Sequence, residues 1–276
     1  MNASVVVVIG VGGMGQAIAS RQGAGRRLLL ADFDHRTLSS VAERMRGQGH
    51  DVVTQTVDVS SRPSVTALAE TAAGIGPVTQ VAHTAGLSPV QASPAAVLRV
   101  DLLGTALVLE EFGRVIAPGG SGVVVSSMAG HMLPAPLSAE QEQALAHTPA
   151  DELLKLPFIA SEFPGPVAYG LAKYGNRLRV QAAGSSWGER GARINTISPG
   201  VIATPMGQQE LDGSSGESMR AMIAASGTGR LGTPDDIAGA AAFLLGPDAS
   251  FITGTDLLVD GGAVAAVRAG HLTRKA

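Results

Sequence analysis

Short apolar segments typical of buried β-strands alternate with segments of helical periodicity along nearly the whole chain of 276 residues. The first, Val5 to Ile9, is β-branched and does not alternate polar with apolar residues, which indicates a strand covered on both faces. This alternation of strands and helices predicts a parallel sheet with helices on both faces. We expect a single doubly wound α/β domain over residues 1–276, with a parallel seven-stranded sheet.

The carboxyl edge of this sheet is where a ligand is expected, because ligands in such folds bind beyond the carboxyl ends of the strands. Asp32, Asp58, His83, Ser127 and Pro199–Gly200 all end or follow predicted strands. Burial explains the strand interiors but not this collection of residues at one edge. The predicted strands cover 5–9, 28–31, 52–57, 78–83, 122–125, 193–197 and 255–259, and the main predicted helices cover 16–20, 37–46, 64–73, 94–116, 167–187 and 234–245.

A glycine-rich turn joins the first predicted strand to the first helix. Gly10, Gly12 and Gly15 fit the G-x-G-x-x-G pattern of Rossmann-type domains, and Met14 lies in the same turn. Glycines there permit a tight turn and close approach of the backbone to a pyrophosphate, while the helix start adds amide donors. The motif alone leaves open a glycine-rich turn without a ligand.

Asp32 ends the second predicted strand, where a carboxylate can accept hydrogen bonds from a ribose diol. The same charge repels a 2′-phosphate, so NAD(H) is favoured over NADP(H) as the cofactor, although Arg36 lies nearby and softens that preference. The alternative for Asp32 is an ordinary loop or helix-capping acid.

Tyr169 and Lys173 lie one turn apart in a predicted helix, so their side chains share a face. A phenol is a poor acid at neutral pH, but a nearby ammonium favours the phenolate and is expected to lower the pKa of Tyr169. Such a tyrosine can give a proton to a substrate oxygen or take one from it. The spacing also occurs by chance on solvated helices, and it gains weight here from the glycine turn.

Composition excludes several classes of function. Aromatic residues make up only 3% of the chain and the net charge is −3, which argues against a nucleic-acid partner. There is no cysteine, so disulfides, thiolate catalysis and cysteine-ligated metals are excluded, and no metal site is expected. We find no signal peptide and no apolar run that could span a bilayer, and we expect a cytoplasmic protein without a membrane partner.

Together, these motifs resemble those of the short-chain dehydrogenase/reductase family over nearly the whole length. The resemblance implies that Tyr169 is the proton donor or acceptor, that Lys173 lowers its pKa and binds the nicotinamide ribose, and that Ser127 polarises the substrate oxygen. The motifs that carry the resemblance are the glycine turn, Asp58–Val59, Ala85–Gly86, Ser127, Tyr169 with Lys173, Asn195 to Gly200, Thr204, and Asp260 to Gly262.

The same resemblance implies further contacts with a dinucleotide. Asp58, with Val59 beside it, is expected to contact the adenine, and Thr204 is expected to hold the carboxamide. The remaining cofactor-binding positions that it implies are Ala85, Gly86, Pro199, Gly200 and Ile202.

Three positions depart from the family pattern. Ile9 precedes the glycine turn where relatives usually carry an alcohol, so phosphate hydrogen bonding is expected to differ. His83 replaces an asparagine, and we interpret it as a packed histidine rather than a catalytic one. Asp101 stands where the family usually has a catalytic asparagine, and it is a candidate catalytic residue. The family role rests partly on a backbone carbonyl and a bound water, so two outcomes are open: an aspartate retains that role, or its buried carboxylate alters the proton relay and its pH dependence.

A long segment over residues 131–166 separates Ser127 from Tyr169, and a similar insert occurs in the 3α-hydroxysteroid dehydrogenase/carbonyl reductase branch. Ser138 to Gln141 fits a capping box, and Thr148 to Asp151 fits a second helix start. We expect this insert to overhang the substrate site as an apolar lid, with a subunit interface as the alternative. The segment from Met206 to Met222 is expected to form a second, mobile flap.

The favoured function is transfer of a hydride between NAD(H) and a small-molecule alcohol or ketone that is bulky and apolar, such as a steroid-like, alicyclic or aromatic compound. One alternative is a 3-oxoacyl-thioester (acyl-carrier-protein) reductase, which shares the core motifs. An alternative of another class is a non-catalytic dinucleotide-sensing protein. The resemblance further implies a homo-oligomer, with a homotetramer favoured.

Overall fold

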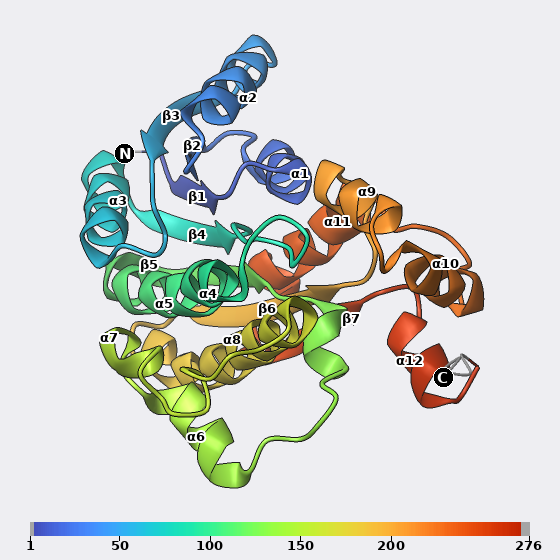
Figure 1. Ribbon diagram of the computed structural model, residues 1–276. Helices are drawn as coiled ribbons and strands as arrows, with labels where there is room; N and C mark the ends of the chain where they lie inside the picture. The colour runs from blue at the N-terminus through green and yellow to red at the C-terminus, as the bar shows by residue number, and fades with distance from the viewer. Residues whose placement is uncertain (1–2, 272–276) are drawn as a thin grey trace.

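The computed structural model describes residues 3–271 as an α/β fold built on one seven-stranded sheet with the order β3-β2-β1-β4-β5-β6-β7 (Figure 1). All neighbouring strands pair in parallel, which confirms the predicted fold class. The strand order reverses direction between β1 and β4, and ligands of open α/β sheets bind at such a switch point. The strands are β1 Val5–Ile9, β2 Arg27–Asp32, β3 Asp51–Thr56, β4 Val78–His83, β5 Ile116–Val125, β6 Arg193–Pro199 and β7 Asp256–Val259.

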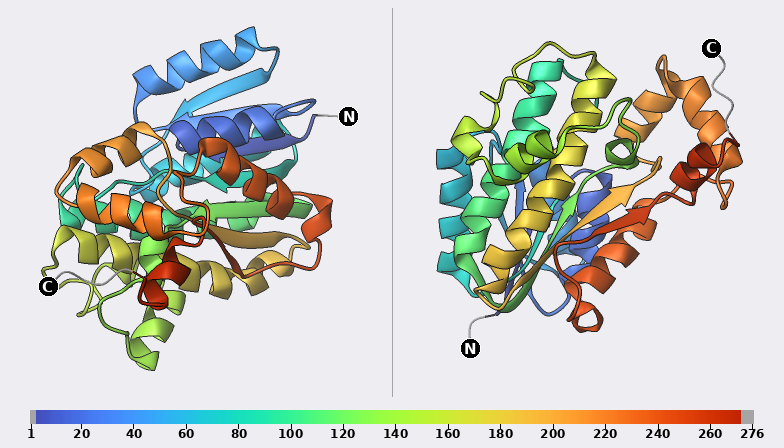
Figure 2. Two further views of the ribbon diagram at one scale, coloured as in Figure 1. Left: turned by 90° about the vertical axis from the view of Figure 1, so that its right-hand side faces the viewer. Right: turned by 90° about the horizontal axis from the view of Figure 1, so that it is seen from below.

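Helices cover both faces of the sheet, and two views show the resulting layers (Figure 2). The apolar residues of α3, α5 and α8 share one core cluster with one face of the sheet, and those of α1, α2 and α11 share a second cluster with the other. The helices are α1 Gly13–Gln22, α2 His35–Gly47, α3 Arg62–Ile75, α4 Pro94–Val97, α5 Gly104–Val115, α6 Ala139–His147, α7 Ala150–Leu153, α8 Gly165–Gly188, α9 Pro205–Asp212, α10 Gly216–Ala225, α11 Pro234–Leu245 and α12 Ala263–Arg268.

The central strand β1 shows why this sequence forms a buried parallel sheet. All five of its residues, Val5 to Ile9, are fully buried between the two helical layers. Full burial of each such side chain stabilises the fold by about 1.5–3 kcal/mol. At the other end of the chain, α11 begins as predicted, with a capping box between Thr233 and Asp236 and with Pro234 in its first turn.

The segment predicted as one continuous helix over 94–116 is interrupted. Between α4 and α5 lies a π-helical turn, η1, over Leu98–Leu103, and the backbone N–H of Gly104 donates to the carbonyl of Arg99. The apolar periodicity continues across the interruption, so the sequence pattern did not reveal it. Isolated π turns often occur at functional sites, and Asp101 lies inside this one.

The insert over 131–166 contains α6 and α7, and the capping box at Ser138 is present. Leu145, Leu153 and Ile159 of the insert are almost completely buried in the same core cluster as α5 and α8. The apolar side chains that suggested a lid therefore pack into the core of this chain, against the helices that flank the sheet.

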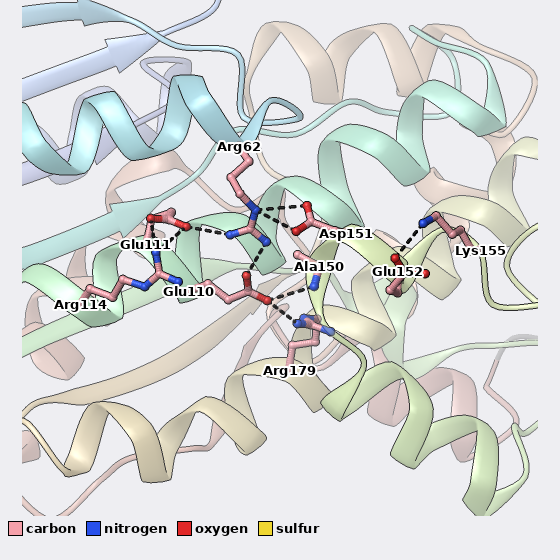
Figure 3. A network of polar contacts seen from close by, with 9 residues as sticks. All are labelled: Arg62, Glu110, Glu111, Arg114, Ala150, Asp151, Glu152, Lys155 and Arg179. Carbon is pink, nitrogen blue, oxygen red and sulfur yellow. Dashed lines mark hydrogen bonds and ion pairs between the residues drawn. The ribbon is translucent and has the colours of Figure 1, made fainter.

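Ion pairs and hydrogen bonds connect the insert to α3, α5 and α8 (Figure 3). The guanidinium of Arg62 pairs with Glu110, Glu111 and Asp151, and Glu110 also accepts a hydrogen bond of 3.0 Å from the backbone N–H of Ala150. Arg179 of α8 donates to the carbonyls of two insert residues, Leu145 and Thr148. These contacts hold the start of α7 over the outer side of α5 and α8.

The segment from Met206 to Met222, predicted as a flap, forms much of α9 and α10 beyond the carboxyl ends of β6 and β7 (Figure 1). Its apolar residues take part in a third core cluster that includes Met128, Val201, Leu211, Met219 and Met222. Within residues 3–271, no helix combines the length and the apolar character needed to cross a membrane.

Candidate active site

The glycine turn after β1 has the shape expected for a diphosphate cradle. Gly10 has a φ of +90°, and a Cβ there would lie 2.5 Å from the backbone nitrogen of Ala85. A Cβ on Gly15 would collide with the carbonyl oxygen of Gly10, so both positions require glycine for packing. A Cβ on Gly12 would meet no atom within 4 Å, which leaves the amino end of α1 open to a ligand.

Asp32 lies at the end of β2 beside this turn. Its Oδ2 atom accepts a hydrogen bond of 2.7 Å from the backbone N–H of Val11, and Oδ1 accepts one of 3.0 Å from Asp34. These bonds fix the carboxylate at the rim of the turn and leave lone pairs for further donors. Met14, also predicted to bind the cofactor, packs against the apolar cluster beneath α1.

The loops after β3 and β4 border the same edge. Oδ1 of Asp58 accepts hydrogen bonds from both the backbone N–H and the hydroxyl of Ser60, while Val59 is buried against α5. The backbone N–H of Ala85 donates to the carbonyl of Ile9 over 2.9 Å, which joins this loop to the glycine turn. Gly86 follows directly and approaches the lysine described below.

The segment after β6 lies at the same edge of the sheet. Pro199 ends β6, and the backbone N–H of Gly200 donates to Val259. Ile202 is buried, and Thr204 caps α9 by accepting a hydrogen bond of 3.1 Å from the backbone N–H of Gly207. A Cβ on Gly13 would lie 2.9 Å from the methyl group of Thr204, so this segment lies directly against the glycine turn.

Tyr169, Lys173 and Ser127 meet next to these loops. Lys173 is buried in α8, and its Nζ atom lies 5.4 Å from the centroid of the Tyr169 ring. Ser127 follows β5, and its hydroxyl accepts a hydrogen bond of 3.1 Å from the backbone N–H of Ala129. Burial raises the pKa of Tyr169, and a side-chain hydrogen bond with Ser127 lowers it by a smaller amount.

Lys173 does lower the pKa of Tyr169, as expected, but the pKa nevertheless lies above its ordinary value. Burial raises the pKa of Tyr169 more than the charge of Lys173 lowers it, and the carboxylate of Asp101 raises it further. Tyr169 is therefore a protonated phenol at neutral pH. The sequence showed the lysine, but it could not show how far the phenol is removed from water.

Asp101 contacts Lys173 directly. Its Oδ2 atom lies 3.0 Å from Nζ of Lys173, and its side chain is fully buried. Burial lowers the pKa of Lys173, but the contact with Asp101 raises it, and the net shift is upward. Lys173 therefore carries its positive charge at neutral pH, with a carboxylate as its partner.

His83, the last residue of β4, is buried and its neutral form is strongly favoured. Burial and the charge of Lys173 lower its pKa to about 3. Neither ring nitrogen has a hydrogen-bond partner among residues 3–271. These observations agree with the interpretation of His83 as a packed residue rather than an acid or base.

Sequence reasoning missed Glu210, a partly buried carboxylate of α9. Its charge raises the pKa values of both Tyr169 and Lys173. Burial in turn raises the pKa of Glu210. The sequence around Glu210 in α9 carries no motif that would single this acid out.

Comparisons with known proteins agree with this geometry. Residues 4–139 match the family model of short chain dehydrogenases, and residues 140–264 match a model described as enoyl-(acyl carrier protein) reductase. The crystal structure of gox2181 superposes with a TM-score of 0.76 over 96% of this chain and 97% of that chain, at 23% identity, which shows a shared fold.

Several curated relatives match most of the chain. A short-chain dehydrogenase/reductase, bsc3, from Alternaria brassicicola is 43% identical over 96% of this chain and 97% of its own length. A D-threitol dehydrogenase from Mycolicibacterium smegmatis is 30% identical over 95% and 93% of the two chains. A 3-alpha-hydroxysteroid dehydrogenase/carbonyl reductase from Comamonas testosteroni is 32% identical over 67% and 72%. The chain therefore belongs to the short-chain dehydrogenase/reductase family, whose members are oxidoreductases that act on alcohols and ketones.

Proposed function

We propose that this protein transfers a hydride between NAD(H) and a bulky, apolar alcohol or ketone, with Tyr169 as the acid or base. The observation that carries the proposal is the meeting of Tyr169, Lys173 and Ser127 beside the glycine turn, at the carboxyl edge of the sheet. A protein that only senses a dinucleotide needs neither a partly buried phenol nor a buried lysine at that place.

The residues around the glycine turn fit a dinucleotide. The open surface at Gly12 and the amino end of α1 would hold the diphosphate, because free backbone N–H groups and the helix dipole favour an anion there. The fixed carboxylate of Asp32 would accept hydrogen bonds from the adenosine ribose and repel a 2′-phosphate, which favours NAD(H). When bound, the nicotinamide ring supplies or accepts the hydride.

The protein's own groups move the proton and position the substrate. In reduction, Tyr169 donates its proton to the carbonyl oxygen as that oxygen gains charge, and the Ser127 hydroxyl donates a hydrogen bond to the same oxygen. Lys173 stabilises the resulting phenolate by its charge. In oxidation the phenolate of Tyr169 takes the proton, so that direction requires deprotonation first.

The surroundings of Ser127 favour an apolar substrate. Met128 follows Ser127 directly and belongs to the cluster with Leu211, Met219 and Met222 from α9 and α10. Methionine side chains adapt to irregular apolar shapes, which suits a bulky ring system better than a short polyol. We assign the role of substrate cover to α9 and α10, because the apolar residues of the insert are already buried against α5 and α8.

A substrate panel tests this function. Wild-type protein is incubated with NADH or NADPH and with alicyclic, aromatic and steroid ketones, a 3-oxoacyl thioester and a keto sugar, and cofactor consumption is followed by absorbance. The proposal predicts fastest turnover of a bulky apolar ketone with NADH. Preference for the thioester or the sugar would contradict the substrate class, and dinucleotide binding without turnover of any substrate would favour the sensing protein.

A further inference from the structure

A buried carboxylate contacts the lysine of the proposed catalytic group. Oδ2 of Asp101 lies 3.0 Å from Nζ of Lys173, and the two side chains are only 0% and 6% exposed. The other oxygen, Oδ1, accepts a hydrogen bond of 2.8 Å from the backbone N–H of Leu87. Burial raises the pKa of Asp101 more than the charge of Lys173 and the hydrogen bond from Leu87 lower it, so the carboxylate depends on its contact with the ammonium. Two opposite charges so completely removed from water interact strongly, and loss of one leaves the other uncompensated.

The local backbone fixes this carboxylate in place. Asp101 lies in the π-helical turn η1, and its carbonyl oxygen accepts a hydrogen bond of 2.8 Å from the hydroxyl of Thr105. The side chain, rather than the backbone, therefore contacts the lysine. A Cβ on Gly86 would lie 3.1 Å from Oδ2 of Asp101 and 3.2 Å from Nζ of Lys173, so glycine at this position leaves room for the ion pair.

We propose that Asp101 is a positioning residue that holds the Lys173 ammonium through a buried ion pair and cancels part of the positive charge that faces the Tyr169 ring. This inference rests on the proposed function, which gives Tyr169 the transferable proton. Asp101 contacts neither the substrate oxygen nor the Tyr169 hydroxyl in the proposed mechanism. It acts through Lys173. Beside a lysine that is paired with Asp101, Tyr169 is a weaker acid than it would be beside a lysine without a partner.

Charged groups from several elements face the Tyr169–Lys173 pair. Burial raises the pKa of Tyr169, Lys173 lowers it, and the carboxylates of Asp101 and Glu210 raise it. His83 of β4 is neutral near pH 7, because burial lowers its pKa to about 3. Within residues 3–271, Asp101 is the only carboxylate that forms an ion pair with Lys173. Removal of Asp101 should therefore change the pKa of Tyr169 more than removal of Glu210.

The titration of Tyr169 can be measured without turnover, because the chain has only two tyrosines. Tyr174 contacts Glu142 on the outer side of α8, so Tyr174→Phe leaves Tyr169 as the sole phenol. In this background, tyrosinate absorbance is recorded after stopped-flow pH jumps, before the protein can unfold. Asp101→Asn is introduced into the Tyr174→Phe protein and compared with it. Asp101→Ser is a second variant, in which the new side chain is smaller than that of aspartate.

We expect both Asp101 variants to move the midpoint of Tyr169 titration to lower pH by about one unit or more, the size usual for a neighbouring charge. Glu111→Gln is the matched control, because it also removes a buried, ion-paired carboxylate but lies away from Tyr169, and it should leave the midpoint unchanged. An unchanged or higher midpoint in folded Asp101 variants would overturn the inference.

The same variants separate this inference from the proposed function. In alcohol oxidation, the rate of Asp101→Asn should reach its plateau at a lower pH than that of the wild type. If Tyr169→Phe retains full activity, the proposed function fails whatever the titration shows. If Tyr169→Phe is inactive and the pH profile of Asp101→Asn matches that of the wild type, only the role of Asp101 fails.

Discussion

The ammonium of Lys173 lies 5.4 Å from the centroid of the Tyr169 ring, one helical turn along α8, and both side chains are at least partly buried. The spacing in the sequence brings the two together, and packing against the sheet decides their protonation. Burial raises the pKa of Tyr169 more than Lys173 lowers it. Tyr169 is therefore a neutral phenol near pH 7, which suits an acid in the proposed reduction.

The direction of this shift predicts different pH profiles for the two reaction directions. Oxidation needs the phenolate of Tyr169, so kcat/KM for the alcohol should rise about tenfold per pH unit below the pKa. Reduction needs the phenol, so its rate should change little on the acid side of that pKa. Both profiles follow from initial rates with one substrate pair, and an oxidation rate that is flat from neutral to alkaline pH would contradict the assignment of Tyr169 as the base.

Substitution of Asp32 should change the cofactor preference. Asp32→Ser removes the charge that opposes a 2′-phosphate, so the ratio of kcat/KM with NADH to that with NADPH should fall by about tenfold or more, since like charges in contact cost several kcal/mol. Asp34→Ser, two residues further along the chain, is the matched control, because the Asp34 side chain caps α2 by accepting a hydrogen bond from the backbone N–H of Arg36. If the ratio of kcat/KM with NADH to that with NADPH is equal in the wild type and Asp32→Ser, Asp32 does not contact the ribose of the cofactor.

His83 should make the stability of the protein depend on pH. Its pKa is lowered from 6.5 to about 3 by burial and by Lys173, so between these values the unfolded chain binds a proton that the native chain does not. Above pH 6.5, His83 is neutral in both the native and the unfolded chain and causes no loss of stability. As the pH falls below 6.5, protonation of His83 in the unfolded chain decreases the free energy of unfolding by about 1.4 kcal/mol per pH unit. Urea denaturation at several pH values measures the slope.

The variant His83→Asn should remove this contribution, whereas substitution of the exposed His147 by asparagine should not. Since burial also lowers the pKa of His131, the comparison uses the difference between wild type and variant at each pH. A difference that does not vary with pH would contradict the buried neutral state of His83.

Two neighbouring leucines test how the insert packs. Leu153 is completely buried in the core cluster, whereas Leu154 is only partly buried against it. Leu153→Ala should lower the free energy of unfolding by about 2–5 kcal/mol, as expected for a cavity in a core, and Leu154→Ala should lower it by less. Equal effects in urea denaturation would indicate that the insert is loosely attached.

The fold was predictable because strong local signals agree. Buried β-branched strands such as Val5 to Ile9, the glycine turn and the capped start of α11 each specify a piece of the same doubly wound sheet. The candidate site followed from those signals, because parallel strands deliver their carboxyl ends to a single edge.

Other features depend on three-dimensional packing that a sequence pattern does not contain. The π turn at Asp101 keeps the apolar periodicity of its neighbours, so it reads as ordinary helix. The burial of Leu145 against α8 and the approach of Glu210 to Tyr169 join segments far apart in the sequence. The sign of the Tyr169 pKa shift likewise depends on how much water these contacts exclude.

The most direct test of the central claim compares wild-type protein with Tyr169→Phe in a single turnover of NADH and ketone, after dinucleotide binding by both has been measured. We expect equal binding and a loss of about 10²–10⁴-fold in the rate for the variant, since phenylalanine keeps the ring but has no proton to give. A variant that binds the dinucleotide and reduces the ketone at the wild-type rate would contradict it.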